Sequence, residues 1–262
     1  MAAEPLVPLV DETGEAEEVL PGGNVGGAVR VGATVRRPTG PWTPAVHELL
    51  AFLADADLEH VPRVLGTDAR GREVLTYLPG RVVPIGVEDL TDAQTAATMA
   101  WLRRYHEVVA GFPRGSRRWR FAERGLGPGE IVCHHDVATY NLVYEGDELA
   151  GVLDWDVAGP GVPLDDVAIF AWNGPLLRPE VDAVVAARGL RLVADAYGGL
   201  DPHDLLDHVP VRMTNAVARI AAGARAGDPG MLRLGTVGEP DRTRRRVARL
   251  LERTAELHDA IG

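Results

Sequence analysis

The sequence predicts an α+β fold of two lobes: a small lobe rich in antiparallel strands and a larger lobe that is mostly helical. In residues 20–78, short β-branched runs alternate with turn signals around one amphipathic helix. After Pro79, longer segments with helical periodicity dominate. Four such segments follow: 92–109, 180–198, 203–227 and 240–261. The predicted lobes are residues 1–78 and 79–262.

Two hairpins and a helix account for the small lobe. One hairpin joins strands 28–31 and 34–36, and the other joins strands 64–67 and 73–78, each across a Gly-containing turn. Between them, Pro44 predicts the first position of a helix. The helix has one apolar stripe: Val46, Leu49, Leu50 and Leu53.

Composition excludes several classes of function. The net charge is −11, which argues against a nucleic-acid partner because phosphate backbones require a basic surface. All 27 basic side chains are arginine, so Schiff-base and Walker-A lysine mechanisms are excluded. The single cysteine, the lack of a signal peptide and the lack of a long apolar run predict a cytoplasmic protein without membrane contact. We expect a monomer or homodimer.

Three polar side chains between residues 131 and 156 are candidates for chemistry: Asp136, Asn141 and Asp154. The last two flank a predicted hairpin. With a four-residue loop, Asn141 pairs directly with Asp154, with Cα atoms about 5 Å apart. With a two-residue loop, Asp154 moves one diagonal step away. Either register puts a carboxamide and a carboxylate at one end of the ribbon.

Mg²⁺ prefers one or two oxygen ligands from protein, with phosphates and water completing its octahedron. Asp136 lies five residues before Asn141, close to such an ion. A carboxylate there can orient a hydroxyl and accept its proton during phosphoryl transfer. Singly, these residues are common in turns; the ordered set favours a site. A zinc site at His134-His135 is disfavoured because no third and fourth ligands stand at suitable spacing.

The string His134-x-Asp136-x-x-x-x-Asn141, followed by Asp154, resembles the catalytic core of the aminoglycoside phosphotransferase and choline kinase-like family. Leu75-Thr76-Tyr77-Leu78-Pro79-Gly80 resembles its inter-lobe linker, and Pro163-Leu164-Asp165-Asp166-Val167-Ala168 resembles its segment after the metal-binding aspartate. The resemblance covers residues 20–175 and implies a protein-kinase-like fold.

By position, the resemblance implies that Asp136 is the catalytic base. It implies that Asn141 and Asp154 hold Mg²⁺ on the phosphates of ATP or GTP, and that His134 packs the loop. The linker would offer backbone groups to the nucleotide base: Thr76, Tyr77 and Leu78. The stretch Gly22–Gly27 stands where a phosphate-covering loop belongs.

Two departures from the family pattern matter. His135 stands where the family often has glycine, and arginine replaces the phosphate-binding lysine of the small lobe. We assign that arginine to Arg36, with Arg37 on the other face of the strand. Glu48 is the best candidate to orient Arg36, with His47 second. Arginine keeps the charge but has a longer and wider fork than an ammonium group.

The sequence therefore predicts an ATP- or GTP-dependent O-phosphotransferase that acts on a hydroxyl of a small molecule, such as an aminoglycoside or a metabolite. The alternative is a pseudokinase that binds a ligand without phosphoryl transfer, suggested by the missing lysine and by His135. The acceptor depends on residues 180–262. Acidic side chains there would meet a cationic substrate or are plain surface charges: Asp204, Asp207 and Asp228.

Overall fold

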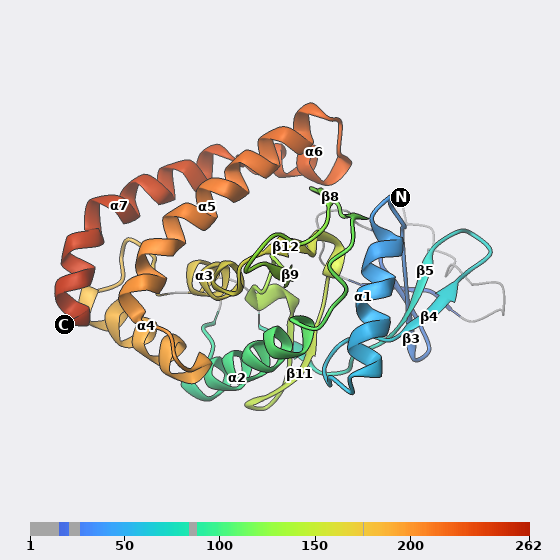
Figure 1. Ribbon diagram of the computed structural model, residues 1–262, viewed down its shortest axis with the longest axis horizontal. Helices are drawn as coiled ribbons and strands as arrows, with labels where there is room; N and C mark the ends of the chain where they lie inside the picture. The colour runs from blue at the N-terminus through green and yellow to red at the C-terminus, as the bar shows by residue number, and fades with distance from the viewer. Residues whose placement is uncertain (1–15, 21–26, 84–87, 175) are drawn as a thin grey trace, which may run out of the picture.

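The computed structural model describes residues 16–20, 27–83, 88–174 and 176–262. A small sheet with one helix forms one lobe, on the right of Figure 1, and a helical lobe forms the rest. This confirms the predicted α+β architecture of two lobes. Most of the glycine-rich stretch, Gly22 to Gly26, lies outside the described residues, and the lobe boundary at residue 78 stays a prediction.

The small lobe is one antiparallel sheet with strand order β1-β2-β3-β5-β4. Its strands are β1 (Glu18–Val19), β2 (Val29–Val31), β3 (Thr34–Arg37), β4 (Val64–Thr67) and β5 (Glu73–Thr76). Helix α1 (Thr43–Asp55) connects β3 to β4. All four residues of its predicted apolar stripe are buried, which anchors α1 to the core.

The large lobe contains six helices within the described residues. They are α2 (Asp92–Val109), α3 (Pro163–Asn173), α4 (Ala183–Tyr197), α5 (Pro202–Arg225), α6 (Pro229–Thr236) and α7 (Asp241–Ile261). The prediction lacks α3 and α6, whose 11 and 8 residues give little room for periodicity. Helix α5 packs against both α3 and α7. Within the described chain, no helix combines the length and apolar character that crossing a membrane requires.

Short strands surround residues 131–156, the candidate catalytic segment, between the two lobes. They are β6 (Arg81–Val82), β7 (Arg117–Arg118), β8 (Glu123–Arg124), β9 (Ile131–Cys133), β10 (Leu142–Glu145), β11 (Glu148–Val152) and β12 (Gly159–Gly161). Strand β9 pairs with β12, and β6 joins the β10–β11 hairpin. Figure 1 shows β9 and β12 between α3 and the small lobe.

A cluster of aromatic side chains packs around Trp155, next to the candidate catalytic loop. Trp155 is 1% exposed, and its ring lies edge-on to His134, with centroids 4.5 Å apart. Tyr105 and Trp101 of α2 contact the same indole. Trp155 is therefore a core residue, as is the buried Trp172.

The start of α2 gives a first testable prediction. Thr91 Oγ1 accepts a hydrogen bond from the Gln94 N–H, and the Gln94 side chain accepts one from the Thr91 N–H, a complete capping box. Thr91→Ala should lower the free energy of unfolding by about 1 kcal/mol, measured by urea titration. Thr91→Ser, which keeps the hydroxyl, should stay close to wild type.

Candidate active site

The loop after β9 is held by one buried carboxylate. Asp166, on α3, is fully buried and accepts the backbone N–H groups of His134 (2.8 Å) and His135 (2.6 Å). His106 Nε2 lies 3.2 Å from the same carboxylate. Burial opposes ionisation, but the His106 hydrogen bond and the neighbouring histidines outweigh it and hold the pKa of Asp166 well below its usual range. Asp166 thus braces the loop.

His134 fixes the direction of the loop. Its Nδ1 accepts the Asp136 N–H at 3.2 Å, so Nε2 carries the proton and donates to the Leu153 carbonyl at 3.0 Å. The ring is completely buried. This one side chain ties the catalytic loop to the strand end that precedes Asp154, which is a structural role.

The Asp136 carboxylate lies at the centre of a small hydrogen-bond network. Tyr140 donates its hydroxyl to Oδ1 at 2.7 Å, and Asn141 Nδ2 donates to Oδ2 at 2.8 Å. Asn141 Nδ2 also donates to the Asp136 carbonyl at 2.9 Å. Burial, reinforced by the charge of Asp154, raises the pKa of Asp136 to about 6. The carboxylate is therefore a stronger base than an exposed aspartate.

The β10–β11 hairpin has the shorter of the two loops considered from the sequence. Glu145 pairs with Glu148 across the turn, and a register shift follows before Leu142 meets Val152. Asn141 O consequently accepts the Leu153 N–H at 2.8 Å, which puts Asp154 one residue past direct pairing. Asp154 adopts a left-handed backbone, φ 60°. The turn and bulge thus deliver Asp154 to the same end of the ribbon as Asn141.

The small-lobe cation is Arg37, and this corrects the assignment to Arg36. Arg37 NH2 lies 2.8 Å from Asp154 Oδ1 and 3.0 Å from Asp156 Oδ1. Arg36 instead donates to Thr34 Oγ1 and lies 3.9 Å from Asp68. Neighbouring residues of a strand face opposite sides, so an error of one position inverts the assignment.

Glu48 does not orient the site arginine, contrary to expectation. It is half exposed and pairs with Arg117. Glu73, directly opposite Arg37 in the sheet, takes this place with Oε1 3.7 Å from Arg37 Nε. His47, the second candidate, contacts the other oxygen of Glu73 at 2.8 Å. A charged residue opposite Arg37 in the register was the signal that sequence reasoning missed.

Two backbone N–H groups of the linker already donate hydrogen bonds within the protein and cannot donate to a nucleotide base. The Thr76 N–H donates to the Arg63 carbonyl at 3.0 Å, and the Tyr77 N–H donates to the Ala33 carbonyl at 2.9 Å. A base would have to use other groups of the linker, such as those of Leu78. Recognition of the nucleotide base by the backbone of Thr76, Tyr77 and Leu78 therefore stays a prediction. The N–H groups of Thr76 and Tyr77 are no longer candidates for it, because both are hydrogen-bonded within the protein.

The site fits a magnesium ion. Asp154 and Asp156 supply hard oxygen donors together with the Asn141 carboxamide oxygen. Burial raises the pKa of Asp156 to about 6, and the charge of Asp154 adds to this rise although Arg37 and Arg120 oppose it. Carboxylates that raise one another's pKa are stabilised by a nearby divalent cation.

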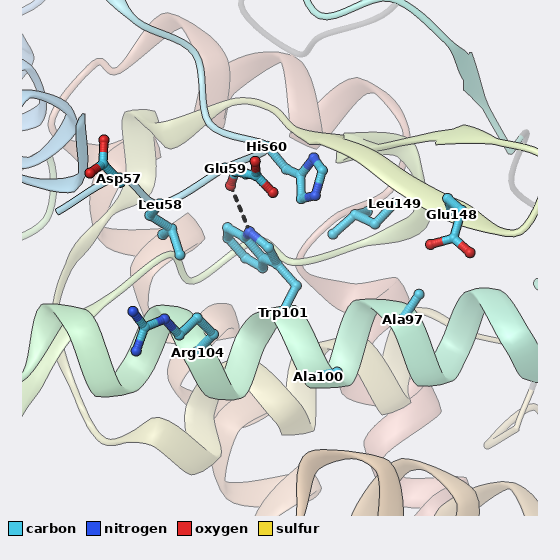
Figure 2. A pocket seen from close by; sticks show the side chains of 10 residues that line it. All are labelled: Asp57, Leu58, Glu59, His60, Ala97, Ala100, Trp101, Arg104, Glu148 and Leu149. Carbon is cyan, nitrogen blue, oxygen red and sulfur yellow. Dashed lines mark hydrogen bonds between the residues drawn. The ribbon is translucent and has the colours of Figure 1, made fainter. Parts of the chain in front are cut away.

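A separate pocket of about 410 Å³ lies between α2, β11 and the segment after α1. Figure 2 shows the side chains that line it: Asp57, Leu58, Glu59, His60, Ala97, Ala100, Trp101, Arg104, Glu148 and Leu149. The Trp101 indole donates to the Glu59 carbonyl at 2.9 Å. None of the candidate site residues lines this pocket, so it is distinct from the cluster around Asp136.

Solved structures with this fold support the architecture. An amicoumacin kinase in complex with AMP-PNP and Ca²⁺ aligns over 95% of this chain and 84% of its own, with a TM-score of 0.58 and 14% identity. A choline/ethanolamine kinase family protein from Mesorhizobium loti aligns over 89% and 92%, with a TM-score of 0.54 and 17% identity. The GDP complex of aminoglycoside 2'-phosphotransferase-IIIa aligns over 92% and 93%, with a TM-score of 0.56 and 13% identity.

Sequence comparisons give the family. Residues 119–206 match the model of the phosphotransferase enzyme family, and this range contains the whole catalytic segment. The trifolitoxin immunity protein of Rhizobium leguminosarum bv. trifolii is 32% identical over 195 residues, which cover 70% of this chain and 74% of that protein. The chain therefore belongs to the phosphotransferase enzyme family.

Proposed function

We propose that this phosphotransferase uses MgATP or MgGTP to phosphorylate a hydroxyl of a small molecule. The observation that carries the proposal is the convergence of Asp136, Asn141 and Asp154 at the end of one hairpin, with Arg37 against Asp154. The comparison structures with AMP-PNP and with GDP support both donors equally. The related immunity protein makes protection from a toxic compound a natural setting.

Asp136 is the proposed base. Its carboxylate, oriented by the Tyr140 hydroxyl and the Asn141 amide, accepts the proton of the acceptor hydroxyl. The hydroxyl oxygen forms a bond to the γ-phosphorus, and the bond from that phosphorus to the bridging oxygen breaks, which releases the nucleoside diphosphate. With a pKa of about 6, Asp136 is mostly ionised near neutral pH and still basic enough to take the proton.

Asn141 and Asp154 would hold Mg²⁺, which neutralises the charge on the phosphates when it is bound. Arg37 would donate its fork to phosphate oxygens, because arginine binds phosphate bidentately. Glu73, only 3% exposed, keeps Arg37 in the site from the opposite strand. A cytoplasmic location and a monomeric or dimeric state remain predictions.

One observation favours the alternative, a kinase-like binding protein without phosphoryl transfer. Arg37 already pairs with Asp154 and Asp156, so it competes with a metal ion for the same oxygens. The presence of Asp136, Asn141 and Asp154 together favours the enzyme.

Thermal shift measurements with MgATP, MgGTP and metal-free nucleotide separate the two functions. A nucleotide at 100 times its Kd should add about 2.7 kcal/mol of stability. The enzyme requires a larger shift with magnesium than without it. No shift with any nucleotide would contradict nucleotide binding altogether, and an equal shift without metal would favour the binding protein.

The arginine assignment makes a further prediction. Arg37→Met should weaken MgATP binding about tenfold or more, because it removes a charge-assisted contact to phosphate. Arg36→Met is the matched control on the same strand and should change the Kd by less than about threefold. Titration calorimetry measures both, and a larger loss in Arg36→Met would restore the assignment to Arg36.

A further inference from the structure

A second cluster of charges lies between α5 and the loop that contains His135 and Asp136. Arg212 and Arg219 stand seven residues apart on α5, hence on one face of the helix, and both reach His135. Arg212 NH2 donates to the His135 carbonyl at 2.7 Å. Arg219 NH2 lies 3.4 Å from His135 Nε2. Two cations thus converge on the residue next to Asp136.

The donors of this cluster exceed its acceptors. Arg212 is 3% exposed, yet its Nε and NH1 have no hydrogen-bond partner in the part of the chain that the structure describes. His135 Nε2 donates to the Pro160 carbonyl at 3.2 Å, which leaves His135 Nδ1 as a buried acceptor without a partner there. Burying an unpaired guanidinium nitrogen is costly, because the group loses water and gains no acceptor. The arrangement is therefore suited to a bound acceptor group.

The neighbouring carboxylates already have other partners. Asp166 accepts the loop amides, and Asp165 accepts the Val162 N–H at 3.1 Å and lies 2.9 Å from His208 Nε2. Burial, together with the charge of Arg212, lowers the pKa of Arg219 to about 10. An anion beside the Arg219 guanidinium would offset the repulsion that it experiences from Arg212.

A small cavity opens beside these groups. It measures about 20 Å³, and His135 and Arg219 line it with Trp119, Phe121 and the segment Val157–Pro160. This volume holds little more than one water-sized sphere, so it admits a single oxygen of an anionic group and excludes a sugar ring. Two of the lining residues, His135 and Val157, are the chain neighbours of Asp136 and Asp156.

A metal ion is the other ligand to weigh here. Cys133, His135 and Asp165 place ligand atoms within 4.8 Å of one another, which the sequence spacing did not show. The two arginines beside His135 oppose a cation. Burial raises the pKa of the Cys133 thiol well above its usual value, whereas a metal ligand must be a thiolate. An anion fits the charges better than a metal ion does.

We propose that the acceptor carries a carboxylate or phosphate group, which binds to Arg219 in this cavity, beside Arg212 and His135, while its hydroxyl faces Asp136. This rests on the proposed function and names its substrate class. It replaces the idea of a cationic acceptor, because two of the three acidic side chains considered for such a substrate already have partners. Asp228 pairs with Arg120 at 3.0 Å, and Asp207 lies 2.8 Å from His258.

Anion binding to the MgADP-saturated protein tests the proposal, since MgADP occupies the nucleotide phosphate site. Inorganic phosphate and malonate are titrated separately by calorimetry, with chloride at equal ionic strength as the blank. We expect saturable binding of at least one anion; phosphate alone would indicate a phosphorylated acceptor, and malonate alone an acid. R219Q should weaken it about tenfold or more, and R219K should restore part of the affinity.

The matched control is R225Q, which removes an exposed arginine six residues further along α5 and should leave anion affinity unchanged. No anion binding in the wild type, or equal losses in R219Q and R225Q, would overturn the proposal. Stoichiometric zinc binding that C133S abolishes would assign the cluster to a metal instead.

MgADP affinity, measured first, keeps this test separate from the proposed function. If MgADP does not bind, the proposed function fails, and the anions are titrated into the nucleotide-free protein. Loss of anion binding in R219Q and not in Arg37→Met would then still support an anion site at Arg219. The reverse result would place the anion at Arg37.

Discussion

Asp136→Asn should lower kcat for phosphoryl transfer by about 10²- to 10⁴-fold, the usual contribution of a positioned general base. Asparagine keeps the size of the side chain and can still meet Tyr140, but it cannot accept the hydroxyl proton. The nucleotide Kd should stay within about threefold of wild type, because Asp136 is not assigned to the phosphates. The loss therefore belongs in kcat.

The measurement needs an acceptor, found by screening aminoglycosides, macrolides, nucleosides, amino alcohols, hydroxy acids and sugar phosphates for nucleotide consumption. Asp195→Asn, an exposed aspartate on α4, is the matched control and should keep full activity. Unchanged turnover in Asp136→Asn would rule out Asp136 as the base. A loss of turnover that accompanies a loss of folded protein, seen by circular dichroism, would leave the base unassigned, so the melting curve is recorded alongside.

The catalytic segment could be predicted from the sequence because its geometry is local. Asp136 and Asn141 share one loop, and a hairpin brings back Asp154, so chain connectivity alone sets their distance. The register shift after Tyr144 changed the pairing by one residue without separating the groups. Local chain geometry tolerates such an error, and the three residues meet as expected.

The small lobe shows where the same reasoning fails. Arg36 and Arg37 are adjacent and chemically identical, and only the register of β3 against β5 decides which one faces Asp154. On a strand with four half-buried residues, the hydrophobic pattern does not fix that register. The assignment of Glu48 was wrong for the same reason. The carboxylate that pairs with the arginine lies on the neighbouring strand β5, and not on α1.

Contacts across long stretches of sequence were out of reach altogether. Arg212 meets His135 from a helix 77 residues away in the chain, and its buried position follows from how α5 packs on α3. Sequence spacing contains no signal for that approach. The substitution of histidine for glycine at position 135 was visible, but its partner was not.

Asp166→Asn should reduce the free energy of unfolding by about 3–5 kcal/mol, as expected when one member of a buried charged network is removed. The amide has one acceptor oxygen, whereas Asp166 uses both oxygens for the His134 and His135 amides. Its NH₂ group would therefore face a backbone donor. Urea unfolding measures the loss, with Asp195→Asn as an exposed control expected within about 0.5 kcal/mol of wild type.

The pH dependence separates the charge of Asp166 from its packing. The folded-state pKa lies well below the unfolded value of about 3.9, so the carboxylate stabilises the fold above that value. This stabilisation is lost as the pH falls through the unfolded pKa towards the folded one. The free energy of unfolding of the wild type should exceed that of Asp166→Asn by a constant amount between about pH 5 and 8. This difference in free energy should narrow below about pH 4. A gap that persists unchanged at pH 3 would mean that shape, and not ionisation, makes Asp166 essential to the catalytic loop.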